Sequence, residues 1–171
     1  MPEFYIQKNS MKQGCGAVVQ DENSKNTYFL VGKIGSNGDT LALYNLLGEH
    51  LAKIQQTSAV FGANFDLFIG EEKFARMIKI MNWRKTMYFI PKLKWLIHGD
   101  LTTHIYTISD GLREVMSMKP VSTSFGDVFS IIIKVDSEVN ICLCIASVLD
   151  YWSYNRENQA ALNSMFSIRG I

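Results

Sequence analysis

The sequence predicts a mainly β protein: a closed antiparallel barrel of about twelve strands with a hydrophobic helix buried near the C-terminal end. Three observations predict it, namely a series of short apolar segments separated by turn residues, a hairpin unit that recurs, and one apolar stretch, Val139–Trp152. The 171 residues fit one domain, long enough to bury roughly 70% of the surface that the unfolded chain exposes. We assign residues 1–155 to the barrel and residues 156–171 to a C-terminal tail that is a short helix or disordered.

The strand candidates are short runs rich in Val, Ile, Phe, Tyr, Thr and Leu that end at Gly, Asn or Asp. Asn-Gly within Ser36–Asp39 and Asp-Gly within Ser109–Gly111 are dipeptides favoured in tight hairpins. No helical pattern separates the runs, which favours antiparallel pairing. Two weaker candidates lie near residues 4–8 and 15–20, and the ten stronger ones are 27–34, 39–46, 50–56, 64–70, 73–80, 86–90, 92–99, 104–111, 113–119 and 127–135.

Parts of these strands repeat. Glu49–Ile54 (EHLAKI) returns as Glu72–Met77 (EKFARM) and more faintly as Arg113–Met118 (REVMSM), while Phe61–Ile69 resembles Phe125–Ile133. The spacing between the copies is irregular, which disfavours solenoids and propellers because both need a fixed period. The repetition instead indicates a meander built from similar hairpins.

The apolar stretch is best explained as the filling of the barrel. A bilayer-spanning helix needs about 20 apolar residues, and this stretch is too short. A barrel much wider than eight strands cannot fill its interior with strand side chains alone, and a helix at about 138–152 would be long enough to cross it. We expect Asp136 or Ser137 to cap its start and Glu138 to suit its first turn. A last buried strand is the alternative, because periodicity does not separate the two in a short run.

Composition points to a cytoplasmic protein without strong overall charge. Lys and Arg number 17 against 16 Asp and Glu, so the molecule has no net attraction to nucleic acid or membrane, and we expect no nucleic-acid partner. The three cysteines are an odd number, and Cys142 and Cys144 are too close in sequence for a comfortable disulfide. We interpret them as reduced thiols in a protein that is cytoplasmic or peripheral at the membrane.

Catalytic patterns are scarce, and we predict no catalytic residue, metal site or cofactor. His98, Asp100 and His104 suggest a metal site only if the chain does not turn at Gly99-Asp100, and Gly-Asp usually marks a turn. Cys15 lies between two glycines, without an identifiable partner histidine. An enzyme is therefore the least favoured class, although sites assembled from distant strands escape this kind of reasoning.

Positive charge is concentrated in one segment of the chain, between Glu72 and Asp100, which we call the basic window. No acidic residue lies between Glu72 and Asp100, and aromatic residues, Trp83 among them, are interleaved with the cations. This mixture suits an anionic membrane surface or lipid head group, and it would also suit single-stranded nucleic acid. The alternative without ligand binding is a solvated barrel face whose lysines keep strand edges soluble. The basic residues of the window are Lys73, Arg76, Lys79, Arg84, Lys85, Lys92 and Lys94.

The ordered set YFLVG, LLGEHLAKIQQ, GEEKFARMIKI, KWLIHGD, HIYTISDG and FGDVFSIII leading into ICLCIASVLDYW resembles the LURP-one-related family of the tubby-like superfamily, which includes the phospholipid scramblases. The resemblance covers roughly residues 27–152 and implies a twelve-stranded barrel threaded by a hydrophobic helix. Tubby domains bind phosphoinositide head groups through basic strand residues, so the resemblance implies a noncatalytic lipid-binding module. A scramblase-like activity is the alternative, although the chain has no cysteine cluster and no acidic calcium loop. A barrel that binds proteins and not lipids is the third class.

Overall fold

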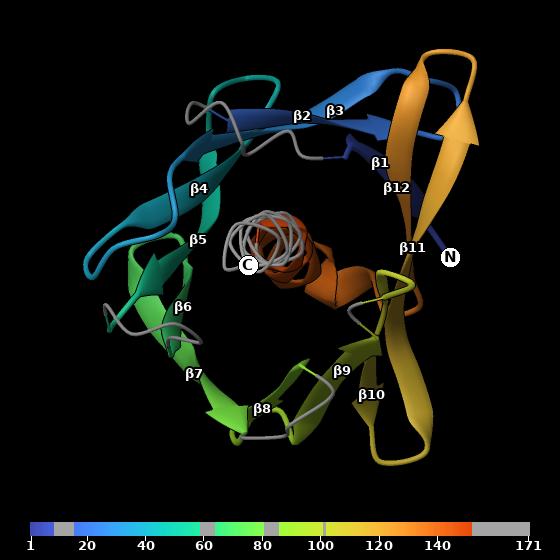
Figure 1. Ribbon diagram of the computed structural model, residues 1–171. Coiled ribbons are helices and arrows are strands. Elements are labelled where there is room, and N and C mark those ends of the chain that lie inside the picture. The colour runs from blue at the N-terminus through green and yellow to red at the C-terminus, as the bar shows by residue number, and fades with distance from the viewer. Residues whose placement is uncertain (9–15, 59–63, 81–85, 101, 152–171) are drawn as a thin grey trace, which may run out of the picture.

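The computed structural model describes residues 1–8, 16–58, 64–80, 86–100 and 102–151. In this part of the chain twelve antiparallel strands form one closed barrel, in which each strand pairs with its sequence neighbours and β1 pairs with β12 (Figure 1). The predicted fold class is confirmed. The strands are β1 Glu3–Gln7, β2 Gly16–Asp21, β3 Asn26–Gly32, β4 Thr40–Asn45, β5 His50–Gln56, β6 Phe65–Ile69, β7 Glu72–Ile80, β8 Thr86–Ile90, β9 Trp95–Asp100, β10 Ile105–Asp110, β11 Arg113–Thr123 and β12 Gly126–Ile133.

The ladder between the first and last strands closes the barrel, and one carboxylate adds a side-chain hydrogen bond across it. Glu3 on β1 accepts hydrogen bonds from Ser130 Oγ on β12 (2.7 Å) and from the hydroxyl of Tyr5 (2.8 Å). The hydrogen bond from Ser130, followed by that from Tyr5, holds the pKa of Glu3 below its ordinary value. A closed sheet leaves no unpaired edge, so this seam removes the site at which the barrel would otherwise aggregate.

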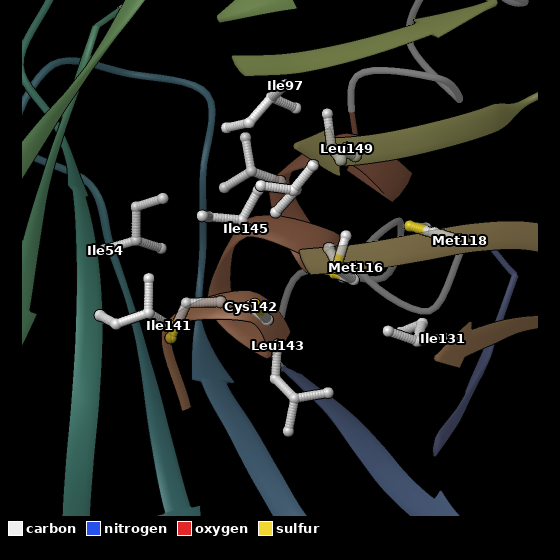
Figure 2. Packing of buried hydrophobic residues seen from close by; sticks show 14 of the residues in the cluster. Ile54, Ile97, Met116, Met118, Ile131, Ile141, Cys142, Leu143, Ile145 and Leu149 are labelled. Carbon is white, nitrogen blue, oxygen red and sulfur yellow. The ribbon is translucent and has the colours of Figure 1, made fainter. Parts of the chain in front are cut away.

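A helix of residues 139–151 runs through the centre of the barrel (Figure 1). Its side chains are buried on every side, and Figure 2 shows Ile141, Ile145 and Leu149 packed among residues of the wall such as Ile54 and Met116. Ser147 is buried too, and its hydroxyl donates to the Leu143 carbonyl at 3.0 Å, as a polar group in an apolar core requires. The helix prediction is confirmed, and the alternative of a last buried strand is wrong.

The expected helix cap is wrong. A 3₁₀ turn, η2 (Asp136–Glu138), precedes the helix, and Val135 stands at its N-cap without a side-chain hydrogen bond. Asp136 and Glu138 do lie in this first turn, where negative charge complements the helix dipole. The N-cap position therefore falls on Val135, whose apolar side chain cannot accept a hydrogen bond from the backbone.

The sequence repeat corresponds to a repeated β-bulge. In β5, β7 and β11 the third residue of each repeat, namely Leu51, Phe74 and Val115, is skipped in the pairing register. A bulge turns such a residue off the regular alternation and increases local twist. Leu51 and Phe74 pack partly buried against the core and Val115 is fully buried. These three strands start at the same end of the barrel, where η2 also leads into the helix; we call it the helix-entry end.

Two local expectations need correction. The segment 92–99 is not one strand, because residues 91–94 form a turn and β9 begins at Trp95. Pro91 has no N–H to donate to a ladder, which explains the break. The chain also does not turn at Gly99-Asp100, since β9 continues through both. Gly99 lies under the ring of buried Tyr106, and a Cβ there would come within 2.0 Å of Tyr106 Cδ1.

The turn expected at Ser36–Asp39 is present, with Asp39 N donating to the Ser36 carbonyl at 3.0 Å. It lies inside a longer connection between Gly32 and Thr40 and not in a two-residue hairpin. The C-terminal tail expected at 156–171 lies outside the described residues. Within those residues, no helix is both long and apolar enough to cross a bilayer.

Candidate functional site

The structure describes five of the seven cations of the basic window, and they do not all face the same way. Lys73 and Arg76 project outward from β7, because the bulge at Phe74 separates them by three positions. Lys79 shares the inward parity of Met77, pairs with buried Tyr88 and is half-buried. Lys92 and Lys94 are exposed in the turn between β8 and β9, while Trp83, Arg84 and Lys85 lie outside the described residues.

The sequence did not predict the central residue of this surface, which is Asp66 on β6. Its carboxylate accepts from Arg76 Nε at 2.7 Å and from Arg76 Nη2 at 3.2 Å, and it contacts Lys73 Nζ at 2.9 Å. Burial alone would raise the pKa of Asp66, but the hydrogen bonds and charges of Arg76 and Lys73 hold it below its ordinary value. One carboxylate therefore neutralises one of the two outward charges of β7 and fixes both in place.

Two other lysines of this surface lie against aromatic rings. Lys92 Nζ stands 4.3 Å from the ring centroid of Phe74, and Lys53 Nζ on β5 stands 4.8 Å from that of Phe68. Both distances fall within the range of cation–π attraction. On the outer face Phe68 pairs with Lys53 of β5 on one side and with Lys73 of β7 on the other, so a cation lies on each side of this ring.

At the edge of this face, Glu71 binds two partners. Its carboxylate contacts Lys53 Nζ at 2.8 Å and His50 Nδ1 at 3.1 Å. The hydrogen bond from Lys53 is the main cause that lowers the pKa of Glu71. Lys53 thus differs from Lys92, because it has a carboxylate partner as well as an aromatic one.

The histidines and cysteines do not form a reactive cluster in the described part of the chain. His98 and Asp100 lie on β9, and the buried His104 donates its backbone N–H to the Asp100 carbonyl at 2.8 Å. The residues described include no group of three or more His, Cys, Asp or Glu arranged to hold a metal ion. Cys15 lies outside them.

Cys142 and Cys144 are buried in the central helix, as small core residues. Burial raises the pKa of both thiols, that of Cys144 to about 12. A thiol of this kind is a poor nucleophile because the thiolate is the reactive form.

These features define a class of protein: a closed antiparallel β-barrel filled by its own helix. A sequence model described as LURP-one-related matches residues 3–150, and the chain belongs to the LURP-one-related family. It is 29% identical over 160 residues to the Bacillus subtilis (strain 168) protein named "Uncharacterized protein YxjI", over 94% of this chain and 99% of that one. An X-ray structure of an Arabidopsis thaliana protein covers 91% of each chain with a TM-score of 0.57. At 13% identity this second likeness shows the fold alone.

Proposed function

We propose that this protein is a noncatalytic binding module that recognises anionic phospholipid head groups through the outer surface formed by β7 and the turn between β8 and β9. The observation that carries the proposal is the central helix. Its buried residues Ile141, Leu143, Ile145 and Leu149 fill the centre of the barrel, which favours recognition on the outer surface. On that outside the basic window offers exposed ammonium groups beside aromatic rings, a combination suited to an anionic lipid surface.

The charges set the expected strength. The outward cations Lys73, Arg76, Lys92 and Lys94, together with the carboxylates of Asp66 and the exposed Glu72, leave a local net charge of +2. Near an anionic membrane each net charge contributes about 1 kcal/mol, so the surface supplies about 2 kcal/mol. This free energy corresponds to roughly a 30-fold enrichment at the membrane. The expected binding is therefore peripheral, reversible and weakened by salt.

Sedimentation with liposomes tests the proposal. The purified protein should sediment with vesicles that contain an anionic phospholipid and stay in solution with neutral vesicles, and physiological salt should reduce the bound fraction. The variant Lys92→Glu/Lys94→Glu should lose the binding. A matched control is Lys25→Glu/Lys119→Glu, which makes the same charge change at exposed lysines outside the window.

Equal loss in both double variants would mean that total charge and not this surface attracts the membrane. No sedimentation of the wild-type protein with anionic vesicles, even at low salt, would refute lipid recognition and leave the solvated barrel face as the explanation of the basic window.

A further inference from the structure

We infer that the turn of residues 91–94 is a phosphate contact point, in which Lys92 and Lys94 together hold one phosphate group. The inference rests on the proposed function and deepens it, because it assigns the anion to one turn of the basic window. The chemistry is that of a phosphate, carried by a lipid head group or free in solution.

The turn is a fixed platform with two exposed ammonium groups. Leu93 N donates to the Ile90 carbonyl and Lys94 N donates to the Pro91 carbonyl, both at 3.2 Å. Leu93 packs against the hydrophobic core, while Lys92 and Lys94 on either side of it are exposed. Anchoring of the middle residue keeps both lysines on the outer side of the turn.

These two lysines differ from their neighbours in charge compensation. Two carboxylates of the neighbouring strands already have cationic partners, with Asp66 bound to Lys73 and Arg76 and Glu71 bound to Lys53. Among the described residues, neither Lys92 nor Lys94 forms an ion pair. The helix-entry end as a whole is not strongly positive, since Glu22, Glu49 and Glu72 also lie there. What distinguishes Lys92 and Lys94 is that neither forms an ion pair with a described residue.

Lys92 is held in place before any ligand arrives. Its ammonium lies 4.3 Å from the centroid of the Phe74 ring, and Phe74 is the bulged residue of β7. A phosphate that meets a lysine already placed in this way binds with a smaller loss of side-chain entropy.

Lys94 occupies a backbone conformation that glycine adopts more easily. Its φ is +55°, and in two other turns at the same end, those of the hairpins β6–β7 and β10–β11, the residues with a positive φ are Gly70 (φ +56°) and Gly111 (φ +59°). A strained backbone position at a residue other than glycine motivates a functional hypothesis for its side chain. At Lys94 the side chain is an exposed ammonium, as a phosphate contact requires.

The test separates stability from binding. Lys94→Gly should raise Tm by about 2–4 °C, because glycine relieves the strain. It should also lower partition to anionic vesicles roughly fivefold, the factor that about 1 kcal/mol per charge gives. Lys94→Arg should retain the binding. Ser24→Gly is the matched control, because Ser24 also has a positive φ (+60°) in a turn at this end and carries no charge; it should raise Tm without a loss of binding.

Two arms distinguish the source of the phosphate. One uses vesicles with a phosphoinositide, and the other adds inorganic phosphate as a competitor in the same assay. Competition by millimolar phosphate that disappears in Lys94→Gly would show that the turn holds the ion itself, and vesicle binding without such competition would show that it needs a head group at a membrane; either result supports the inference. Wild-type binding that Lys92→Gln and Lys94→Gly leave unchanged would overturn the inference and leave the proposed function standing. No binding by the wild-type protein to vesicles or to phosphate would overturn both.

Discussion

The packing of Gly99 under Tyr106 gives a prediction whose magnitude follows from the structure. A Cβ at position 99 would lie 2.0 Å from Tyr106 Cδ1, 2.6 Å from Cε1 and 2.9 Å from Cγ, all on one ring. Tyr106 is 1% exposed and pairs with Gly99 on one side and Met118 on the other, so the ring has to move. Overpacking of this kind costs about 1–3 kcal/mol. Alanine regains about 0.5–1 kcal/mol through the lower entropy of the unfolded chain. We expect Gly99→Ala to destabilise the protein by about 1–2 kcal/mol and to lower Tm by roughly 2–8 °C.

A double-mutant cycle identifies the cause. Chemical unfolding followed by tryptophan fluorescence reports on the buried Trp95, which is on the same strand as Gly99. If the clash with the ring is the reason, Gly99→Ala should cost almost nothing in a Tyr106→Ala background, with a coupling energy of at least about 1 kcal/mol. An equal cost in both backgrounds, or a Gly99→Ala protein as stable as the wild type, would refute the reasoning.

Three further predictions concern carboxylates and thiols. Asp66→Asn should increase binding to anionic vesicles roughly fivefold, because it adds one net positive charge to the surface, and liposome sedimentation with a Glu22→Gln control measures it. The pKa of Glu3 is lowered in the folded protein, so its contribution to stability is present above the unfolded pKa of about 4.3 and is lost as pH falls through the folded value. The Tm difference between wild type and Glu3→Gln should therefore vanish in acid, and a difference that grows there would contradict the assignment. In a Cys15→Ser protein, the thiols of Cys142 and Cys144 should resist alkylation until denaturant unfolds the barrel, and fast labelling under native conditions would contradict their burial.

The helix shows how well the sequence predicted the core. The apolar run after the last strand predicts the position of the helix and its role as the filling of a wide barrel. The same run is too short for a bilayer-spanning helix. The sequence did not predict the residue at the N-cap of the turn that leads into the helix. Both polar candidates, Asp136 and Ser137, lie inside the first turn, and the N-cap position is occupied by Val135.

The basic window shows where prediction from sequence fails. Two of its cations, Lys73 and Arg76, form ion pairs with Asp66, a single carboxylate inside an otherwise apolar strand. A two-residue turn at Gly70-Glu71 with regular pairing would place Asp66 opposite Ala75, and only the bulge at Phe74 moves Arg76 into that position. The bulge depends on packing at the end of the barrel. The spacing of residues in the sequence therefore does not predict the ion pair between Asp66 and Arg76.

The sequence by itself determined that the chain forms a β-barrel, the number and order of its strands, the helix that fills it and the location of the excess positive charge. Each of these depends on local composition and on periodicity, which the chain carries whatever it packs against. Only the tertiary structure decided which cations face outward, which are neutralised and that Lys92 and Lys94 form one turn. These properties depend on register, bulges and contacts between strands, and a shift of one residue in any pairing reverses the face on which a side chain lies.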